Sequence, residues 1–486
     1  MKPIMILGTG SDAGKTVLVA GLCRLFANRG ITTAPFKSQN MSLNSYVTVD
    51  GGEIARATAL QARAARQEPS VHMNPLLLKP KSDDLAQLMV HGKPRMDVSA
   101  ASYFLTDELQ ELKLAAIDES IAVLRARCDL IIAEGAGSCA EPNLRRLDVA
   151  NMGVAHRLGA RVFITADIDR GGAFASLLGT LQVLRLTSPS DLDLIDGYLI
   201  NKFRGDRAVL QPALDFLEAQ TNIPVAGVIP FLPDLRLEEE DRLHERRCDD
   251  PEIDIAVVYL PHISNATDFR YLEAEQRVQV RYVRSVADLG RPDAIIIPGT
   301  KNTTWDLDYI RRIGLEQAIL DIARDTQIIG VCGGYQMLGK VLHDPHRLES
   351  PLGTVDGMRL LDLEVDFLPQ KTLVNRRYEP TADNPFQSAG AVEGYEIHSG
   401  QIRLGSSPAA FAYPGGRDGA VASGGLVFGT FIHDLFKNQL FTRTFVDELR
   451  RRRGLPALTT PLPNLDSPTE ESLERLASEL EEHLRL

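Results

Sequence analysis

The sequence predicts an α/β protein with two domains, and three observations carry that prediction. Short apolar runs alternate with glycine-containing loops and helical patterns along most of the chain, which is typical of doubly wound parallel sheets. A length of 486 residues exceeds what one domain usually contains. A charged stretch without periodicity near 233–252 interrupts the alternation, and a new apolar strand begins at Ile253.

These breaks divide the chain into four parts: a first domain at 1–232, a linker at 233–252, a second domain at 253–445 and a helical extension at 446–486. Within the second domain, 359–368 and 392–404 alternate in polarity and predict antiparallel strands. In the extension, Ser467-Pro468-Thr469-Glu470 predicts a capping box with proline at the first helical position.

Composition excludes several classes of function. A net charge of −12 argues against a broad nucleic-acid surface. The five cysteines form neither a disulfide framework nor a zinc motif, so we expect a reducing, cytoplasmic location. No apolar run approaches the roughly 18 residues of a membrane span. The start of the chain runs directly into a strand and a glycine loop, which is unlike a signal peptide, so we expect no membrane contact.

The first strand, residues 3–8, leads into a glycine loop that predicts a phosphate site. The loop reads Gly8-Thr9-Gly10-Ser11-Asp12-Ala13-Gly14-Lys15-Thr16 and precedes a helical pattern that stops at Gly30. Backbone N–H groups of such a loop bind phosphate, the lysine reaches the β and γ oxygens, and the threonine hydroxyl can bind Mg²⁺. The spacing is one residue longer than the usual motif. We therefore predict a nucleotide site at Gly10, Gly14, Lys15 and Thr16.

Two later strands end in residues that suit the same site. The apolar run 129–134 ends in Glu134, whose carboxylate can hold Mg²⁺ opposite the loop. A second carboxylate remains open between Asp50 and Glu53. Asn201 and Lys202 follow the strand at 196–200, where an amide beside a lysine suits recognition of a nucleotide base.

A polar segment at 35–45 follows another short strand, at the edge where α/β proteins bind ligands. Its amide and hydroxyl groups, together with a lysine at the end of the strand near 74–81, make candidate substrate contacts of Lys37, Gln39, Asn40, Asn44 and Lys79. A solvated polar loop is the alternative interpretation.

In the second domain, the run Gly330-Val331-Cys332-Gly333-Gly334 has the form of a nucleophile elbow. A sharp turn from strand to helix exposes the side chain, and a helix N-terminus favours thiolate. The alternative is a small buried cysteine. The strand at 426–432 delivers His433 as a candidate base, and His398 at another strand end is its rival.

Together these segments resemble the cobyric acid synthases, glutamine-dependent amidotransferases of cobalamin biosynthesis. The resemblance covers almost the whole chain and rests on 8–16, 36–45, 74–80, 134–138, 167–172, 201–206, 330–339, 394–398 and 429–433. It implies a dethiobiotin-synthetase-like P-loop domain followed by a class I glutamine amidotransferase-like α/β domain.

The resemblance also implies a chemistry. Cys332 attacks glutamine, His433 moves the proton, and backbone N–H groups of Gly333 and Gly299 stabilise the oxyanion. ATP with Mg²⁺ activates four carboxylates (b, d, e, g) of adenosylcobyrinic acid a,c-diamide, and ammonia converts them to amides. The expected partners are small molecules, without a tightly bound organic cofactor. The oligomeric state is not predicted.

One residue departs from the wider amidotransferase pattern. Many class I members carry a glutamate two residues after the catalytic histidine, where this chain has Leu435. Three alternatives stay open: a cobyrinate a,c-diamide synthase, a P-loop ATPase switch that binds a protein partner, and a non-catalytic amidotransferase-like scaffold.

Overall fold

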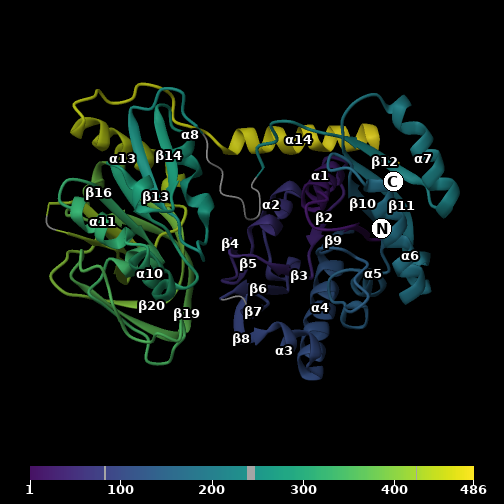
Figure 1. The fold of residues 1–486 in the computed structure, drawn as a ribbon, viewed down its shortest axis with the longest axis horizontal. Coiled ribbons are helices and arrows are strands. Elements are labelled where there is room, and N and C mark those ends of the chain that lie inside the picture. Colours follow the sequence, from purple (N-terminus) through teal and green to yellow (C-terminus); the bar gives the residue numbers. More distant parts are fainter. Residues whose placement is uncertain (82–83, 238–246, 423, 486) are drawn as a thin grey trace.

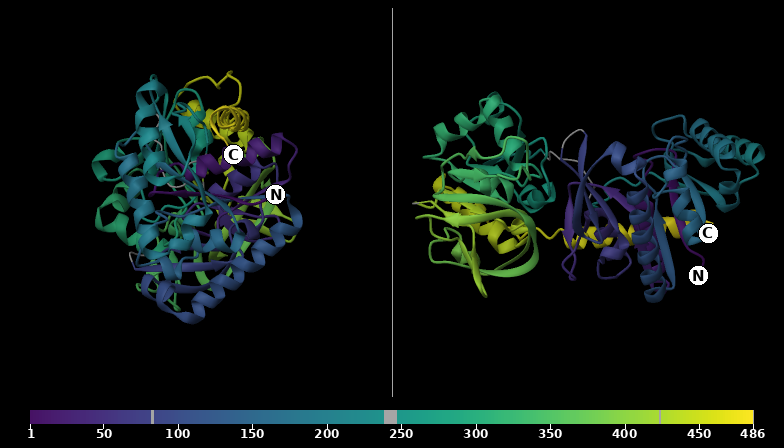
Figure 2. Two further views of the ribbon diagram at one scale, coloured as in Figure 1. Left: turned by 90° about the vertical axis from the view of Figure 1, so that its right-hand side faces the viewer. Right: turned by 90° about the horizontal axis from the view of Figure 1, so that it is seen from below.

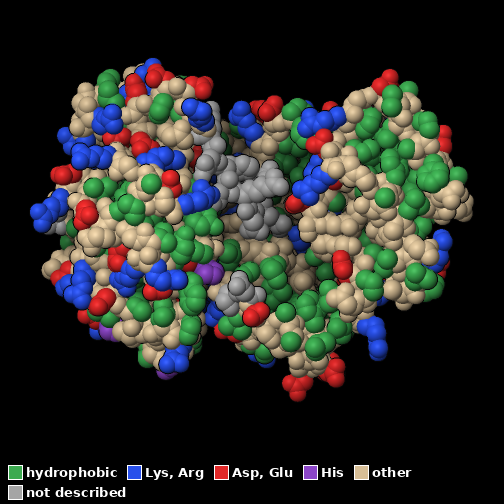
Figure 3. Space-filling model, viewed as in Figure 1, with side chains coloured by type: hydrophobic (Ala, Val, Ile, Leu, Met, Phe, Trp, Pro, Cys, Tyr) green, Lys and Arg blue, Asp and Glu red, His purple; other side chains and the backbone are tan. Residues whose placement is uncertain are grey.

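The computed structural model describes residues 1–486 except 82–83, 238–246, 423 and 486. Two large, mostly parallel sheets lie in two lobes arranged along the long axis of the molecule (Figure 1). Residues 238–246 of the expected linker are outside the described part. No helix among the described residues is long and apolar enough to cross a membrane. On the face shown in Figure 3, positive and negative side chains are interspersed on both lobes.

The first large sheet has the strand order β12-β11-β10-β1-β9-β2, and neighbouring strands in it are parallel. Its strands are β1 Ile4–Gly8, β2 Thr33–Phe36, β9 Leu130–Glu134, β10 Arg161–Asp167, β11 Ile195–Phe203 and β12 Val225–Pro230. Met5 and Leu7 enter one apolar core, whereas Ile4 and Ile6 enter another. The sheet is therefore covered on both faces, which explains why its strands are apolar runs.

The helices of this domain follow the strands as crossover connections. They are α1 Lys15–Asn28, α2 Arg56–Ala64, α3 Ala100–Leu105, α4 Asp107–Arg127, α5 Met152–Leu158, α6 Ala173–Thr187 and α7 Arg207–Thr221. Because parallel strands share one carboxyl edge, the loops after β1, β9, β10 and β11 come together there.

Two smaller sheets extend the first domain toward the second (Figures 1 and 2). One contains β3 Gln39–Met41, β6 Leu76–Pro80, β7 Leu85–Val90 and β8 Lys93–Ser99, and the other pairs β4 Ser45–Val47 with β5 Glu53–Ala55. Their position between the large sheets places the polar segment at 35–45 near both lobes.

The second large sheet has the order β14-β13-β15-β16-β24-β23. Its strands are β13 Ile253–Val258, β14 Val278–Val283, β15 Ala294–Ile297, β16 Gln327–Val331, β23 Ala420–Val421 and β24 Val427–Thr430. The flanking helices are α8 Arg270–Ala274, α9 Val286–Leu289, α10 Thr303–Arg312, α11 Leu315–Ile322, α12 Gly333–Met337 and α13 Gln439–Arg452. The predicted antiparallel pair is present as β19 Leu363–Pro380 and β20 Val392–Leu404. A third six-stranded sheet, built around this pair in the second lobe, also contains β17 Val341–His343, β18 Val355–Asp356, β21 Phe411–Tyr413 and β22 Gly416–Asp418.

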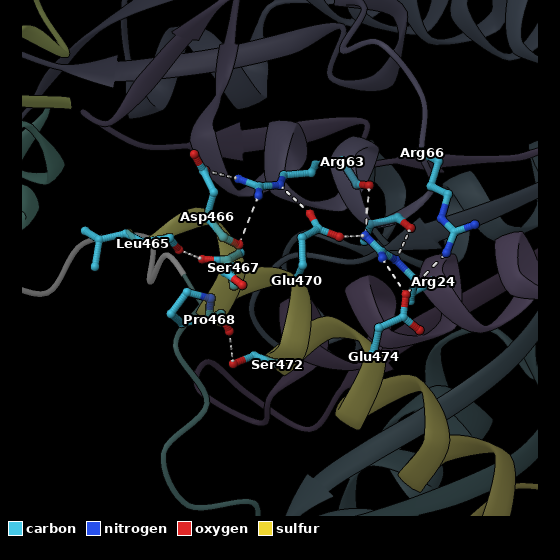
Figure 4. Close-up of polar contacts among 12 residues, drawn as sticks. Arg24, Arg63, Arg66, Leu465, Asp466, Ser467, Pro468, Glu470, Ser472 and Glu474 are labelled. Carbon is cyan, nitrogen blue, oxygen red and sulfur yellow. Dashed lines mark hydrogen bonds and ion pairs between the residues drawn. The ribbon is translucent and has the colours of Figure 1, made fainter. Parts of the chain in front are cut away.

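The last helix, α14 Asp466–His483, returns to the first domain and packs along α1 (Figures 1 and 2). Leu473, Leu476 and Leu480 are buried in the core that α1 lines. Arg24 of α1 lies 2.7 Å from both Glu470 and Glu474, and Figure 4 shows these contacts along the face of the helix.

Two expectations about this end of the chain differ from the structure. Helix α13 crosses residue 445, the expected boundary, because Val446 and Leu449 are buried in the core of the second domain. Helix α14 begins at Asp466, so Ser467 is not its cap. The Asn464 carboxamide accepts hydrogen bonds from the N–H groups of Asp466 and Ser467 instead, at 3.0 and 3.2 Å. Pro468 fits in this first turn because the N–H it lacks would have no helical partner.

Candidate functional site

Cys332 occupies a strained turn between β16 and α12. Its φ is 50° and its ψ is −108°, a conformation that side-chain-bearing residues rarely adopt outside functional sites. The glycines around it allow the close approach that the turn needs. A Cβ on Gly334 would lie 1.9 Å from the Ile297 carbonyl oxygen, and one on Gly330 would lie 2.7 Å from the Gly334 carbonyl oxygen. The strand, turn and helix expected from the sequence are therefore present.

His433 follows β24 and is held by a carboxylate that the sequence analysis missed. Its Nδ1 lies 2.7 Å from the Asp268 carboxylate, and both side chains are buried. Asp268 belongs to the short 3-10 helix η4 (Ala266–Phe269) after β13, and its second oxygen accepts the Asp434 N–H at 3.0 Å. The only signal for it was the polar run Ser264-Asn265-Ala266-Thr267-Asp268 behind a buried strand.

The surroundings of His433 favour its charged form. Burial lowers the pKa of this imidazole, but the negative charges of Asp268 and Cys332 and hydrogen bonds to both raise it to about 10. An imidazolium beside the sulfur stabilises thiolate, the nucleophilic form of cysteine. The arrangement has the parts of a cysteine–histidine–carboxylate triad.

His398, the rival base, has other partners. Its ring nitrogens lie 2.9 Å from Glu396 and 2.7 Å from the Gly400 carbonyl oxygen. Its ring also stacks on Phe431 with centroids 3.5 Å apart. His398 lines the cavity at Cys332, but the interaction with the sulfur belongs to His433.

The two predicted oxyanion glycines flank this group. A Cβ on Gly299, which follows β15, would lie 2.9 Å from His433 Cε1. A Cβ on Gly333 would lie 2.6 Å from Thr300 Cγ2. Gly333 is the first residue of α12, so its N–H has no acceptor within the helix and remains suited to an anion.

A cavity of about 40 Å³ adjoins Cys332 and takes its walls from both domains. Its charged lining groups are Lys79, Lys301, Lys371 and Glu349. Lys79 comes from β6 of the first domain and pairs with Glu53, whose other oxygen lies 2.5 Å from Lys371 of β19. Lys79 was expected as a substrate contact; in the structure it lines the cavity that adjoins Cys332.

The phosphate loop lines a second cavity, of about 1040 Å³, at the carboxyl edge of the first sheet. Lys15 Nζ bridges the carbonyl oxygens of Gly10 and Gly137 at 2.8 and 3.0 Å. Gly14 has a φ of 89°, and a Cβ there would lie 2.2 Å from Asn201 Nδ2. The loop therefore requires glycine at this position.

Asn201 and Lys202 brace the loop from β11. The Asn201 amide donates to the Ala13 carbonyl oxygen at 2.9 Å. Lys202 Nζ donates to the Asp12 carbonyl oxygen at 3.0 Å and to Asp167 at 2.7 Å. Lys202 also lines the cavity, whereas Asn201 lies behind the loop.

Glu134 is buried at the centre of this site. Its carboxylate accepts hydrogen bonds from Thr16 Oγ1 at 2.8 Å, Lys37 Nζ at 2.9 Å and Gln61 Nε2 at 2.5 Å. Burial raises its pKa, but the charge of Lys37 and these hydrogen bonds lower it overall. An ionised carboxylate beside a threonine hydroxyl is a donor set that fits Mg²⁺. Gln61 was not anticipated from the sequence.

Neither expected second carboxylate lines this cavity. Glu53 is held by Lys79 and Lys371, as described above, and Asp50 lies in the turn between β4 and β5, where it accepts a hydrogen bond from Thr48. Of the polar segment, Lys37, Gln39 and Asn40 line the cavity. Asn44 does not, because the chain has turned toward α2, where its carbonyl oxygen accepts the Arg56 N–H at 3.1 Å.

Fold and sites together define a class of protein: a P-loop nucleotide-binding domain joined to a glutamine amidotransferase domain. Residues 4–244 match the family described as "CobQ/CobB/MinD/ParA nucleotide binding domain". Residues 254–441 match the "CobB/CobQ-like glutamine amidotransferase domain".

The sequence identity to curated relatives shows which family within this class the chain belongs to. The chain is 45% identical to a cobyric acid synthase of Dehalococcoides mccartyi (strain CBDB1), over 94% of this chain and 92% of that protein. It is 45% identical to a cobyric acid synthase of Moorella thermoacetica, over 100% of this chain and 96% of the relative. It is 43% identical to a cobyric acid synthase of Listeria monocytogenes serotype 4a (strain HCC23), over 100% of this chain and 95% of that protein. The chain belongs to the cobyric acid synthase family.

Proposed function

We propose that this chain is an ATP- and glutamine-dependent ligase that amidates the b, d, e and g carboxylates of adenosylcobyrinic acid a,c-diamide to give adenosylcobyric acid. The observation that carries the proposal is that one chain holds both a cysteine elbow with a His433–Asp268 pair and a phosphate loop with a large cavity. The two sites supply the nitrogen and the activated carboxylate of one amide bond. ATP and glutamine are both available in the cytoplasm, where we place the reaction.

In the second domain the Cys332 thiolate attacks the side-chain carbonyl of glutamine. The N–H groups of Gly333 and Gly299 bind the oxyanion that forms. His433, charged and held by Asp268, gives its proton to the departing nitrogen, so ammonia leaves and a glutamyl thioester remains. The neutral imidazole then takes a proton from water as water attacks the thioester, which frees glutamate and restores the thiolate.

In the first domain Lys15 and the backbone of the loop from Gly10 to Gly14 bind the phosphates of ATP. Thr16 and Glu134 would hold Mg²⁺, which neutralises phosphate charge when it is bound. A corrinoid carboxylate attacks the γ-phosphorus and ADP leaves. Ammonia then displaces phosphate from the acyl phosphate, and an amide remains.

Substrate contacts and the division into domains are part of the same proposal. Lys37, Gln39 and Asn40 border the large cavity and provide the corrinoid contacts. Asn201 and Lys202 keep the phosphate loop in place at the nucleotide. We assign residues 1–232 with α14 to the synthetase domain, 233–252 to the linker, and 253 through α13 to the amidotransferase domain.

The test uses two nitrogen sources. Cys332→Ser should abolish synthesis from glutamine and retain synthesis from ammonium, with amides counted by mass spectrometry. Unchanged glutamine-dependent synthesis in this variant would refute the mechanism. Supplying cobyrinic acid and its a,c-diamide separately decides the substrate: new amides only on cobyrinic acid would identify a cobyrinate a,c-diamide synthase instead.

A further inference from the structure

One short helix of the synthetase domain touches both sites. Arg56, the first residue of α2, donates from one guanidinium nitrogen to Asp434 Oδ1 at 2.8 Å and from another to Thr267 Oγ1 at 2.9 Å. Both partners belong to the amidotransferase domain, and Arg56 is buried. Buried charge-assisted hydrogen bonds hold geometry more firmly than exposed ones.

The two partners of Arg56 bracket the His433–Asp268 pair. Thr267 directly precedes Asp268, and Asp434 directly follows His433. The Asp434 N–H also donates to Asp268 at 3.0 Å. One guanidinium therefore joins the two segments that carry the pair.

The other end of α2 reaches the nucleotide site. Gln61 is fully buried and follows Arg56 by five residues, about 7.5 Å along a helix axis. Its amide nitrogen donates to Glu134 at 2.5 Å and lies 3.3 Å from the Thr16 carbonyl oxygen. If Glu134 binds Mg²⁺, fewer of its lone pairs can accept a hydrogen bond from Gln61. Occupancy of the nucleotide site would therefore weaken the contact between Glu134 and α2.

We propose that Arg56 is a positioning residue for glutamine hydrolysis, supplied by the synthetase domain, and that α2 makes this positioning depend on the state of the nucleotide site. The inference rests on the proposed function. It explains physically how ammonia release can be tied to the presence of ATP: the helix that contacts the Mg²⁺ ligand also holds the histidine segment. An ordinary ion pair between domains is the competing explanation.

The experiment compares three full-length variants with the wild type. Glutamate release is measured with and without ATP and corrinoid a,c-diamide, and synthesis is measured with glutamine and with ammonium. Arg56→Ala should lower kcat for glutamine hydrolysis by about tenfold, in the range of coupling carried by residues between sites. The KM for glutamine should stay within about twofold of the wild-type value, and so should the rate of synthesis from ammonium. Arg56→Lys should recover part of kcat, because one ammonium can still pair with Asp434.

Gln61→Leu removes the link to Glu134 and should reduce the ratio of glutaminase rates with and without ATP toward one. Arg63→Ala is the matched control, because Arg63 lies on the same helix but pairs with Asp466 and Glu470 of α14 (Figure 4). It should change neither rate by more than about twofold.

Three results would overturn the inference: an unchanged kcat in Arg56→Ala, an equal loss of ammonium-dependent synthesis in that variant, or an equal loss in Arg63→Ala. A wild-type protein that makes no amide from either nitrogen source would instead refute the proposed function. The two failures are therefore distinguishable in the same assays.

Discussion

The Asp268 carboxylate lies 2.7 Å from His433 Nδ1, although 165 residues separate the two in the chain. It occupies the role that many class I amidotransferases give to a glutamate two residues after the histidine. Leu435, at that position here, is buried in the apolar core of its domain. In this chain the carboxylate that holds the imidazole comes from another element, the 3-10 helix η4.

Asp268→Asn should reduce kcat for glutamine-dependent synthesis by about 10²–10⁴-fold, because the imidazole loses the charge that fixes its tautomer and stabilises the imidazolium. The same change removes the main interaction that raises the pKa of His433. The alkaline limb of the rate profile should therefore move to lower pH. Rates measured from pH 6 to 10 check both effects, with ammonium-dependent synthesis as the internal control. An unshifted alkaline limb would contradict the assignment.

Ionisation of the buried Asp418 carboxyl group should lower the free energy of unfolding of the amidotransferase domain as pH rises. Burial and the negative charge of Glu396 raise the pKa of this carboxyl group to about 7, although Thr430 and the Phe431 N–H donate to it. In the unfolded chain the Asp418 carboxyl group ionises near pH 4. Between about pH 4 and pH 7 the native state therefore holds a proton at Asp418 that the unfolded state has lost. The free energy of unfolding should fall across this window by a few kcal/mol, on the order of 1.4 per pKa unit.

Denaturant titrations at pH 4.5 and 7.5 measure this dependence. Trp305, the single tryptophan, lies in α10 of the same domain and reports its unfolding by fluorescence. Asp418→Asn should flatten the dependence on pH. A variant that retains the slope of the wild type would show that other groups cause it.

Glu134→Gln should raise the Mg²⁺ concentration needed for half-maximal ATP-dependent synthesis, because a neutral amide binds Mg²⁺ poorly. We expect a shift of about 10-fold or more. Titration of synthesis with Mg²⁺, using ammonium as nitrogen source, isolates this site from glutamine hydrolysis. Thr16→Ser keeps the hydroxyl and is the matched control. Coincident titration curves for Glu134→Gln and wild type would remove Glu134 from the metal site.

Gly21→Ala should destabilise the protein although alanine favours helices. Gly21 lies on α1 beneath α14, and a Cβ there would approach Leu480 Cδ1 to 2.5 Å and Leu476 Cγ to 2.7 Å. Such overpacking costs about 1–3 kcal/mol. Gly179 of α6 has open space at its Cβ position, so Gly179→Ala should stabilise by roughly 0.5–1 kcal/mol. Thermal unfolding of the two variants should therefore shift in opposite directions; a common direction would show that the packing of α14 does not decide the effect.

Local patterns were enough to predict much of the fold. A parallel strand buried on both faces is a continuous apolar run, so β1, β9 and β10 could be recognised from their residues alone. The turn at Cys332 was equally visible, because its glycines follow from contacts within a few residues and with one neighbouring strand. Both features are encoded over short distances.

Long-range partners could not be predicted in this way. Glu53 was a metal candidate because it is a carboxylate near the right segment, yet its partner Lys371 lies 318 residues away in the other domain. The position of Lys79 could not be predicted either, since nothing within its strand indicates that Lys79 lines the cavity at Cys332. At 467–470 a local pattern was wrong because Asn464 competed for the same N–H groups.

The return of α14 to the first domain gives the molecule the topology of a domain insertion. The amidotransferase domain is joined to its neighbour at both of its ends, and the second connection ends in a helix that is docked on α1. A protease that cut the chain once at the linker would therefore yield two fragments that still co-purify in native buffer and separate only in denaturant. Conversely, residues 1–232 expressed alone would expose the apolar surface that Leu473, Leu476 and Leu480 cover. A separate peptide carrying α14 should then restore the solubility of this fragment.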